Sequence, residues 1–199
     1  MTHYFENNEN LESKLRIISY IYKGWAFNFY SDIGVFSKNK IDYGSQFLLE
    51  TFLKFNDSNN LSILDVGCGY GFIGICLAKI LNSNVDMIDI NKRAIHLTKM
   101  NVKVSNVNVK VFISNSFENV KEKYNIIITN PPIRAGKKVV LDILLGANDF
   151  LEKNGELWCV IRKDQGAKSI KKELENIYNC RIIAKSKGFY IIKCNKVLT

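Results

Sequence analysis

Proline is almost absent from this chain of 199 residues: Pro131 and Pro132 are the only two, and they stand side by side. Histidine is equally scarce, with His3 and His96 alone, so a histidine-rich metal site is not expected. The five cysteines form no Cys-x-x-Cys pair and are odd in number. We therefore expect no metal, and reduced thiols that are buried as small side chains.

Long apolar runs are missing as well. The longest uncharged apolar stretch covers residues 71–78, far short of the roughly 20 apolar residues that a membrane-spanning helix needs. The first eleven residues are polar and acidic, unlike a secretory signal. These absences predict a cytoplasmic protein with no membrane partner.

Positive charge is distributed unevenly. The net charge is +9; residues 1–120 carry 12 Lys/Arg against 11 Asp/Glu, whereas residues 121–199 carry 16 against 8. A basic half indicates a polyanionic partner, with nucleic acid the first candidate. A solvated lysine face is the alternative explanation.

Strands and helices are expected to alternate from Leu61 onward, which predicts an α/β fold: a doubly wound, mostly parallel seven-stranded sheet. Lys23-Gly24 and Lys187-Gly188 each lie between two runs rich in apolar, aromatic and β-branched residues, so an N-terminal β-hairpin and an antiparallel C-terminal hairpin are expected. Ser45 is expected to cap a helix ending near Phe55. We expect one domain over 1–199, with a pre-core segment 1–43 and a core 44–199. The expected strands are 16–22, 25–30, 61–66, 85–90, 108–113, 124–129, 156–162, 181–185 and 189–193; the expected helices are 45–55, 72–81, 92–104, 138–152 and 167–178.

The expected strand 61–66 leads into a glycine loop, Gly67-x-Gly69-x-Gly71. Such glycines let a ligand approach the backbone closely. Asp65, just before the loop, would repel a pyrophosphate and favour a cationic ligand. An NAD-dependent oxidoreductase is therefore the least supported of the candidate functions. Asp89, at the end of the next strand, can accept both ribose hydroxyls of an adenosine; a helix cap is its alternative role.

The third strand end carries Ser114-Asn115-Ser116. An adenine ring would be read there, with Asn115 as the partner of the exocyclic amine, although Ser and Asn also favour ordinary turns. The fourth strand end carries Asn130-Pro131-Pro132. Two prolines fix the backbone and present the asparagine amide and the neighbouring carbonyl in a stiff loop. These acceptors suit a group with N–H bonds to donate.

These residues resemble a class I S-adenosylmethionine-dependent methyltransferase. Asp65-Val66-Gly67-Cys68-Gly69 resembles the glycine motif, Asp89 the ribose carboxylate, and Asn130-Pro131-Pro132 the loop of the amino-methylating branch. Within that class the chain is most similar to the short relatives of the RsmC-type methyltransferases, which methylate guanine N2 in small-subunit ribosomal RNA. Further matching segments are 34–37, 42–45, 130–138 and 155–158.

The resemblance implies S-adenosylmethionine as cofactor and ribosomal RNA or the small ribosomal subunit as partner, with monomer and homodimer both open. It also implies functional residues. The catalytic loop is Asn130, Pro131, Pro132 and Ile133; the cofactor site is Phe36, Ser37, Gly44, Asp65, Gly67, Gly69, Gly71, Asp89, Ile90, Asn115, Ser116 and Asn130. From their position just beyond this loop or at the end of the next strand, the residues expected to contact RNA phosphates are Arg134, Lys137, Lys138, Arg162 and Lys163. Support of the loop is the alternative role of Arg134.

Two positions depart from the pattern. The residue after the prolines is usually aromatic in amino methyltransferases and stacks on the target base, but here it is Ile133. Stacking would then come from Phe36 or Trp158. The adenine-reading position is often Asp and here is Asn115, whose amide oxygen still accepts a hydrogen bond.

Other functions stay open at this point. A protein-glutamine methyltransferase or an adenine-N6 methyltransferase of DNA or RNA also uses an Asn-or-Asp-Pro-Pro loop. The alternative that is not an enzyme is a non-catalytic RNA-binding or ribosome-assembly protein with the same fold.

Overall fold

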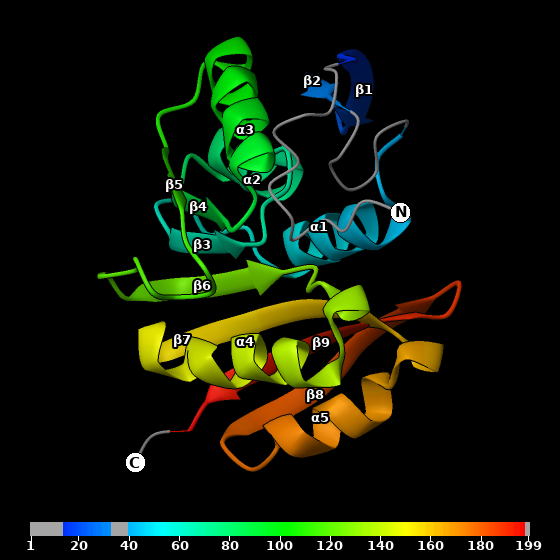
Figure 1. The fold of residues 1–199 in the computed structure, drawn as a ribbon. Helices are drawn as coiled ribbons and strands as arrows, with labels where there is room; N and C mark the ends of the chain where they lie inside the picture. Colours follow the sequence, from blue (N-terminus) through cyan, green and yellow to red (C-terminus); the bar gives the residue numbers. More distant parts are fainter. Residues whose placement is uncertain (1–13, 33–39, 198–199) are drawn as a thin grey trace.

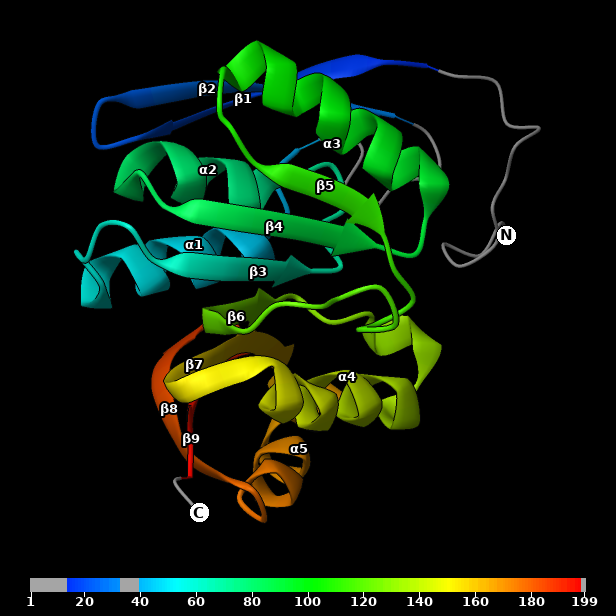
Figure 2. The same ribbon diagram turned by 90° about the vertical axis from the view of Figure 1, so that its left-hand side faces the viewer.

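The structure is a computed structural model that describes residues 14–32 and 40–197. Its centre is a seven-stranded sheet in the order β5-β4-β3-β6-β7-β9-β8 (Figure 1, Figure 2). β3 to β7 are parallel, and β9 runs antiparallel between β7 and β8. The strand order reverses between β3 and β6, where doubly wound sheets bind their ligands. The strands are β3 (Ser62–Val66), β4 (Asn84–Asp89), β5 (Lys110–Ile113), β6 (Tyr124–Thr129), β7 (Leu151–Arg162), β8 (Tyr178–Ser186) and β9 (Phe189–Lys196).

Helices cover both faces of this sheet, so the expected fold class is confirmed. Side chains alternate between the faces along each strand. In β6, Ile126 and Ile128 pack in the core under α1, α2 and α3, whereas Ile127 packs in the core under α4 and α5 (Figure 1). The helices are α1 (Tyr43–Phe55), α2 (Phe72–Leu81), α3 (Lys92–Ser105), α4 (Lys137–Phe150) and α5 (Ala167–Leu174), with short 3-10 helices η1 (Ile133–Ala135) and η2 (Lys163–Gln165).

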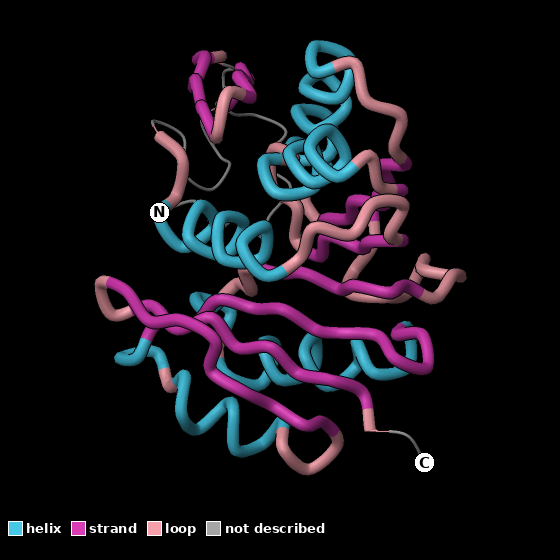
Figure 3. Tube along the Cα trace, turned by 180° about the vertical axis from the view of Figure 1, so that it is seen from behind, coloured by secondary structure: helices cyan, strands magenta, loops and turns pink. Residues whose placement is uncertain are grey.

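The expected N-terminal hairpin forms a two-stranded sheet of its own, β1 (Arg16–Tyr22) and β2 (Trp25–Ser31). It packs on α2 and α3, away from the seven-stranded sheet (Figure 3). Phe27 and Phe29 are buried in the core. Trp25, which alternation places on the same face, is 41% exposed, because it forms the last pair of the ladder, at the turn.

Several helix boundaries differ from the expected ones; α5, for example, ends at Leu174 rather than at residue 178. α1 begins two residues earlier, because Asp42 rather than Ser45 is its N-cap: the Asp42 carboxylate accepts the N–H of Ser45 at 2.8 Å. α4 ends at Phe150 rather than at residue 152, and β7 begins directly after it, with Gly155 inside the strand. A Cβ on Gly155 would come within 3.0 Å of the Tyr124 carbonyl oxygen in β6, so the close approach of these two strands requires the glycine.

The expectation of five reduced cysteines is wrong for one pair: Cys180 of β8 and Cys194 of β9 form a disulfide. A regular ladder from the Lys187-Gly188 turn would pair position 180 with 195. A bulge between Ile182 and Ala184 shifts the register by one residue and places Cys180 opposite Cys194. Cys68, Cys76 and Cys159 are free and buried, as expected.

Candidate active site at the carboxyl edge of the sheet

Site residues expected from the sequence come from the carboxyl ends of three neighbouring strands. Val66, at the end of β3, pairs with Ile88 of β4 on one side and with Thr129 of β6 on the other. The residues that follow these three, Gly67, Asp89 and Asn130, therefore lie at the same edge. The Thr129 hydroxyl also donates to the Val66 carbonyl at 2.8 Å, which ties the Asn130 loop to the glycine loop.

The glycine loop divides into two parts with different roles. A Cβ built on Gly67 or Gly69 meets nothing within 4 Å, so the space in front of these residues is open to a ligand. A Cβ on Gly71 would approach Thr98 at 2.9 Å, and one on Gly74 would come 2.4 Å from the sulfur of Met87. The first two glycines thus leave room for a ligand, and the last two let α2 pack on its neighbours.

Asp89 is held by the loops on both sides of it. One carboxylate oxygen accepts the Gly69 N–H and the other accepts the Asn91 N–H, both at 2.9 Å. The side chain is only 2% exposed. Helix capping belongs instead to Asn91, whose side chain accepts from the N–H groups of Arg93 and Ala94. Asp89 therefore lies beside the glycine loop, and each of its carboxylate oxygens is bound to one backbone N–H.

Asp65 faces the start of α2 rather than the open space. Its Oδ2 accepts the Gly74 N–H at 2.9 Å, which supplies the cap that Gly71 cannot, because glycine has no side chain. Complete burial is the main cause that raises the pKa of Asp65 from 3.8 to about 7, and the nearby Asp89 carboxylate adds to it. The expectation that Asp65 points its charge into the loop is therefore wrong: the carboxylate faces the Gly74 N–H, and burial disfavours its charged form.

The end of β5 places Asn115 on the surface. Its amide nitrogen donates to Glu118 at 2.8 Å, so its oxygen faces the other way, as an acceptor for an amine. Ser116 adopts a left-handed φ of 49°, and the Ser114 hydroxyl donates to its carbonyl at 2.7 Å. The segment is a tight turn, which is compatible with both expected roles. Ile90 is half-buried directly after Asp89.

Asn130 is oriented by α1. Its amide nitrogen donates to Asp42 Oδ2 at 3.0 Å and to Ser45 Oγ at 2.9 Å. Both contacts take the nitrogen, so the amide oxygen points away from them, and it has no hydrogen-bond partner within residues 14–32 and 40–197. Asn130 therefore presents an oriented acceptor, fixed by two residues more than 80 positions earlier in the chain.

In the rest of the loop, one of the expected hydrogen-bond acceptors is already partly used within the loop. The Pro131 carbonyl, expected as the second acceptor, already accepts the Ile133 N–H at 2.9 Å, which leaves one of its two lone pairs. Pro131 is buried, and Pro132 is half-buried. Ile133 packs against the core under α4 and α5. It is therefore poorly placed to cover a base.

Asp42 is the site residue that the sequence reading missed. It appears there only as part of a matching segment, and Ser45 was taken as the helix cap. Aspartate is as good an N-cap as serine, so the Asp42-x-x-Ser45 spacing already allowed this start. Gly44, expected to contact the cofactor, is buried; a Cβ there would lie 3.0 Å from the ring of Phe189 and 3.1 Å from Asp42 Oδ2. Phe36 and Ser37 lie outside the described residues.

The five basic residues expected to contact RNA are all exposed. Lys137 donates to Ser169 at 2.8 Å, and Arg162 forms an exposed ion pair with Asp164 at 2.7 Å. Trp158, one candidate for base stacking, is excluded: it is fully buried and packs edge-on against Phe52. Being in β7, it faces the core under α1 rather than the strand end.

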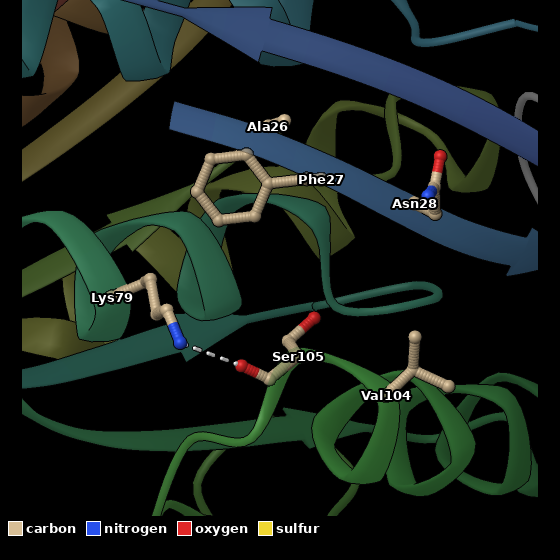
Figure 4. Close-up of a pocket in the computed structure, with 6 residues that line it drawn as sticks. All are labelled: Ala26, Phe27, Asn28, Lys79, Val104 and Ser105. Atoms are coloured by element: carbon tan, nitrogen blue, oxygen red, sulfur yellow. Dashed lines mark hydrogen bonds between the residues drawn. The ribbon is translucent and has the colours of Figure 1, made fainter. Parts of the chain in front are cut away.

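Other features of the surface lie away from this edge. A cavity of about 220 Å³ is lined by Phe27, Lys79 and Ser105 among others, with Lys79 donating to the Ser105 carbonyl (Figure 4). Lys79 and Ser105 belong to the last turns of α2 and α3, which lie at the opposite end of the parallel strands. Over the described ranges, no group of three or more His, Cys, Asp or Glu could hold a metal ion, and no helix there is long and apolar enough to cross a membrane.

Comparisons with known proteins identify the family of the chain. Residues 26–193 match the model of the family described as Methyltransferase small domain. An uncharacterized protein of Bacillus subtilis, YbxB, is 42% identical over 200 residues, which cover 98% of both chains. Ribosomal RNA small subunit methyltransferase C of Buchnera aphidicola is 37% identical over 129 residues, covering 62% of this chain but 38% of that protein.

A solved structure has the same fold. It is the 16S rRNA N2 G1207 methyltransferase RsmC of Thermus thermophilus in complex with AdoMet and guanosine, with a TM-score of 0.82 and 21% identity. The likeness covers 94% of this chain and 52% of that one, so the chain spans about half or less of the ribosomal RNA methyltransferases that it matches. The family model and the Bacillus subtilis relative both cover most of the chain, which therefore belongs to the methyltransferase small domain family of S-adenosylmethionine-dependent methyltransferases.

Proposed function

We propose that the chain transfers a methyl group from S-adenosylmethionine to the exocyclic N2 amine of a guanine in small-subunit ribosomal RNA. The observation that carries this is the orientation of Asn130, whose amide nitrogen is held by Asp42 and Ser45 while its oxygen faces away from them. An amine that donates two N–H bonds finds a fixed acceptor there. The acceptor lies one strand away from the glycine loop.

The cofactor fits the other half of the edge. The open space before Gly67 and Gly69 and the backbone-held carboxylate of Asp89 suit an adenosine ribose, and Asn115 suits the adenine amine. When bound, S-adenosylmethionine supplies a methyl group on a cationic sulfur, and its transfer to an amine leaves a neutral thioether and releases one proton to solvent.

The residues of the loop act by position and electrostatics. An exocyclic amine is a weak nucleophile, because its lone pair is delocalised into the ring. The Asn130 oxygen and the remaining lone pair of the Pro131 carbonyl accept its two N–H bonds and orient the lone pair toward the methyl group. They also stabilise the positive charge that develops on nitrogen. No group with a tuned pKa is needed for this step.

Guanine in ribosomal RNA, rather than another amine, is proposed from the similarity to ribosomal RNA methyltransferases and from the basic second half of the chain. A ribosomal substrate would place the protein in the cytoplasm. The test is to incubate the full chain with S-adenosylmethionine carrying a tritiated methyl group and with ribosomal subunits, naked ribosomal RNA, DNA and release factor in parallel. We expect label in RNA, found as N2-methylguanosine after digestion.

Asn130→Ala tests the role of the Asn130 amide in the same assay. It should lower the turnover rate by roughly 10²–10³-fold, as loss of one preorganised polar group does in other enzymes, and leave cofactor affinity unchanged in calorimetry. Label in DNA or in protein, or wild-type turnover in Asn130→Ala, would overturn the proposal.

A further inference from the structure

The turn between β8 and β9 lies beside the proposed active site. β9 is antiparallel to β7, so the β8–β9 turn returns to the carboxyl end of β7, where Arg162 pairs with Phe189. The turn residues Lys187 and Gly188 have φ of 45° and 79°, the geometry of a tight two-residue hairpin. The Lys163 N–H donates to the Gly188 carbonyl at 2.8 Å, which fixes the turn to the end of β7.

Two aromatic rings and two cations meet there. The rings of Tyr43 and Phe189 lie 5.5 Å apart at 54°. Lys187 Nζ lies 4.4 Å from the centre of the Tyr43 ring, and Arg162 Cζ lies 5.6 Å from the centre of the Phe189 ring. Both rings are half-buried, and both cations are exposed. We call these four residues the turn cluster.

The turn cluster is joined to the catalytic asparagine through the first turn of α1. Tyr43 follows Asp42, which binds the Asn130 amide, and its hydroxyl donates to Ser186 at 2.7 Å. Gly44 lies closely between the Phe189 ring and the Asp42 carboxylate. Figure 1 and Figure 3 both show the β8–β9 turn next to the start of α1. The turn cluster therefore adjoins the part of α1 that holds Asn130.

We propose that the turn cluster binds the single-stranded RNA nucleotides that flank the target base. This rests on the proposed function. Single-stranded RNA is bound by rings on which bases stack and by cations that contact phosphates. The cluster brings both together where the β8–β9 turn meets the end of β7 and the start of α1. The loop itself offers no stacking ring, because the residue after the prolines is Ile133, which is aliphatic and packs against the core. The Arg162–Asp164 pair is exposed on both sides, so a phosphate displaces it at little cost.

The RNA path then differs from the one expected from the sequence. Arg162 and Lys163 remain on it, and Lys187 with the two rings is added. Lys137, by contrast, is engaged by Ser169 and lies 3.8 Å from Glu173 of α5. The path runs from the catalytic loop toward the β8–β9 turn and the start of α1.

The test measures binding of a fluorescent single-stranded RNA to the full chain without S-adenosylmethionine, at several salt concentrations. Arg162→Ala/Lys187→Ala should weaken affinity about tenfold or more and lower the slope of log affinity against log salt by roughly 0.7 per lost phosphate contact. The matched control is Lys168→Ala/Lys172→Ala, which removes the same charge from exposed positions on α5 and should change affinity less than twofold.

Stacking is tested separately at Tyr43. Tyr43→Leu should weaken RNA binding about tenfold with an unchanged salt slope, and Tyr43→Phe, which keeps the ring, should restore it; thermal unfolding reports whether each variant is folded. The inference would be overturned if the cluster and control variants bound RNA with equal affinity. It would also be overturned if the wild-type protein bound polyglutamate as tightly as it binds RNA. Binding is measured without methyl transfer, so the two proposals can fail separately. If the enzyme methylates only protein or DNA, the proposed function is overturned; if the cluster variants still lose RNA affinity, the RNA-binding site stands.

Discussion

Asp42 is expected to act on the reaction through Asn130, and a substitution that keeps its helix-capping role isolates that effect. Asp42 accepts two donors, the Ser45 N–H at 2.8 Å and the Asn130 amide at 3.0 Å. Asparagine caps helices as well as aspartate does, so Asp42→Asn should leave the melting temperature unchanged. What it removes is the negative charge that holds the Asn130 nitrogen inward.

The magnitude follows from the two hydrogen bonds. A bond to a charged acceptor contributes about 1.5–3 kcal/mol and a neutral one about 0.5–1.5 kcal/mol, so the substitution weakens the orientation of the amide by roughly 1–1.5 kcal/mol. The Ser45 hydroxyl still holds the nitrogen at 2.9 Å, which prevents a larger loss. We expect the turnover rate to fall roughly five- to tenfold, with the KM for S-adenosylmethionine unchanged.

A double-mutant cycle on single-turnover methyl transfer to RNA decides between positioning and a separate role of Asp42. If Asp42 acts through Asn130, then Asp42→Asn should change the rate less than twofold once Asn130 is already alanine. The coupling free energy would then equal nearly the whole effect of Asp42→Asn alone. The reasoning is refuted if Asp42→Asn slows the reaction equally in both backgrounds.

Two further predictions concern the cofactor half of the site. Asp89→Ala should weaken S-adenosylmethionine binding in calorimetry by about 10- to 100-fold, because a charge-assisted hydrogen bond to the ribose is lost; unchanged affinity would remove Asp89 from the site. Burial raises the pKa of Asp65 from 3.8 to about 7 in the folded protein, so the folded state binds this proton more tightly than the unfolded state. The resulting contribution to the free energy of unfolding is fully present below about pH 4 and is lost as the pH rises to about 7. Urea unfolding should therefore show wild type losing on the order of 3–4 kcal/mol between pH 4 and pH 8 relative to Asp65→Asn, and parallel curves for the two proteins would contradict the assignment.

Local signals that act over a few residues predicted most of the fold. The expected β6 and α2 agree with the structure residue for residue, because both are apolar runs bounded by clear breaks, the Pro131-Pro132 pair and the glycine loop. Gly67, Asp89 and Asn130 could be placed at one edge for the same reason: each follows a strand, and parallel strands end together.

Contacts between distant parts of the chain could not be predicted in this way. The hydrogen bonds from Asn130 to Asp42 and Ser45 join residues 88 and 85 positions apart, and nothing in either local pattern shows that the start of α1 reaches the end of β6. The Cys180–Cys194 disulfide was missed because one bulge residue changes the register of an otherwise regular hairpin. Trp158 was misread because a residue near a strand end still faces one side of the sheet or the other.

The same distinction separates what is general in this site from what is particular to it. The cofactor half is built from backbone N–H groups, glycines and one carboxylate on adjacent strands, features that a linear motif records in full. The proposed base-binding half combines the loop after β6, the first turn of α1 and the β8–β9 turn, three segments whose order in the chain does not indicate that they meet. Substrate choice in this fold is therefore expected to follow from α1 and the β8–β9 turn, and exchange of those two segments between relatives should move base specificity while cofactor affinity stays constant.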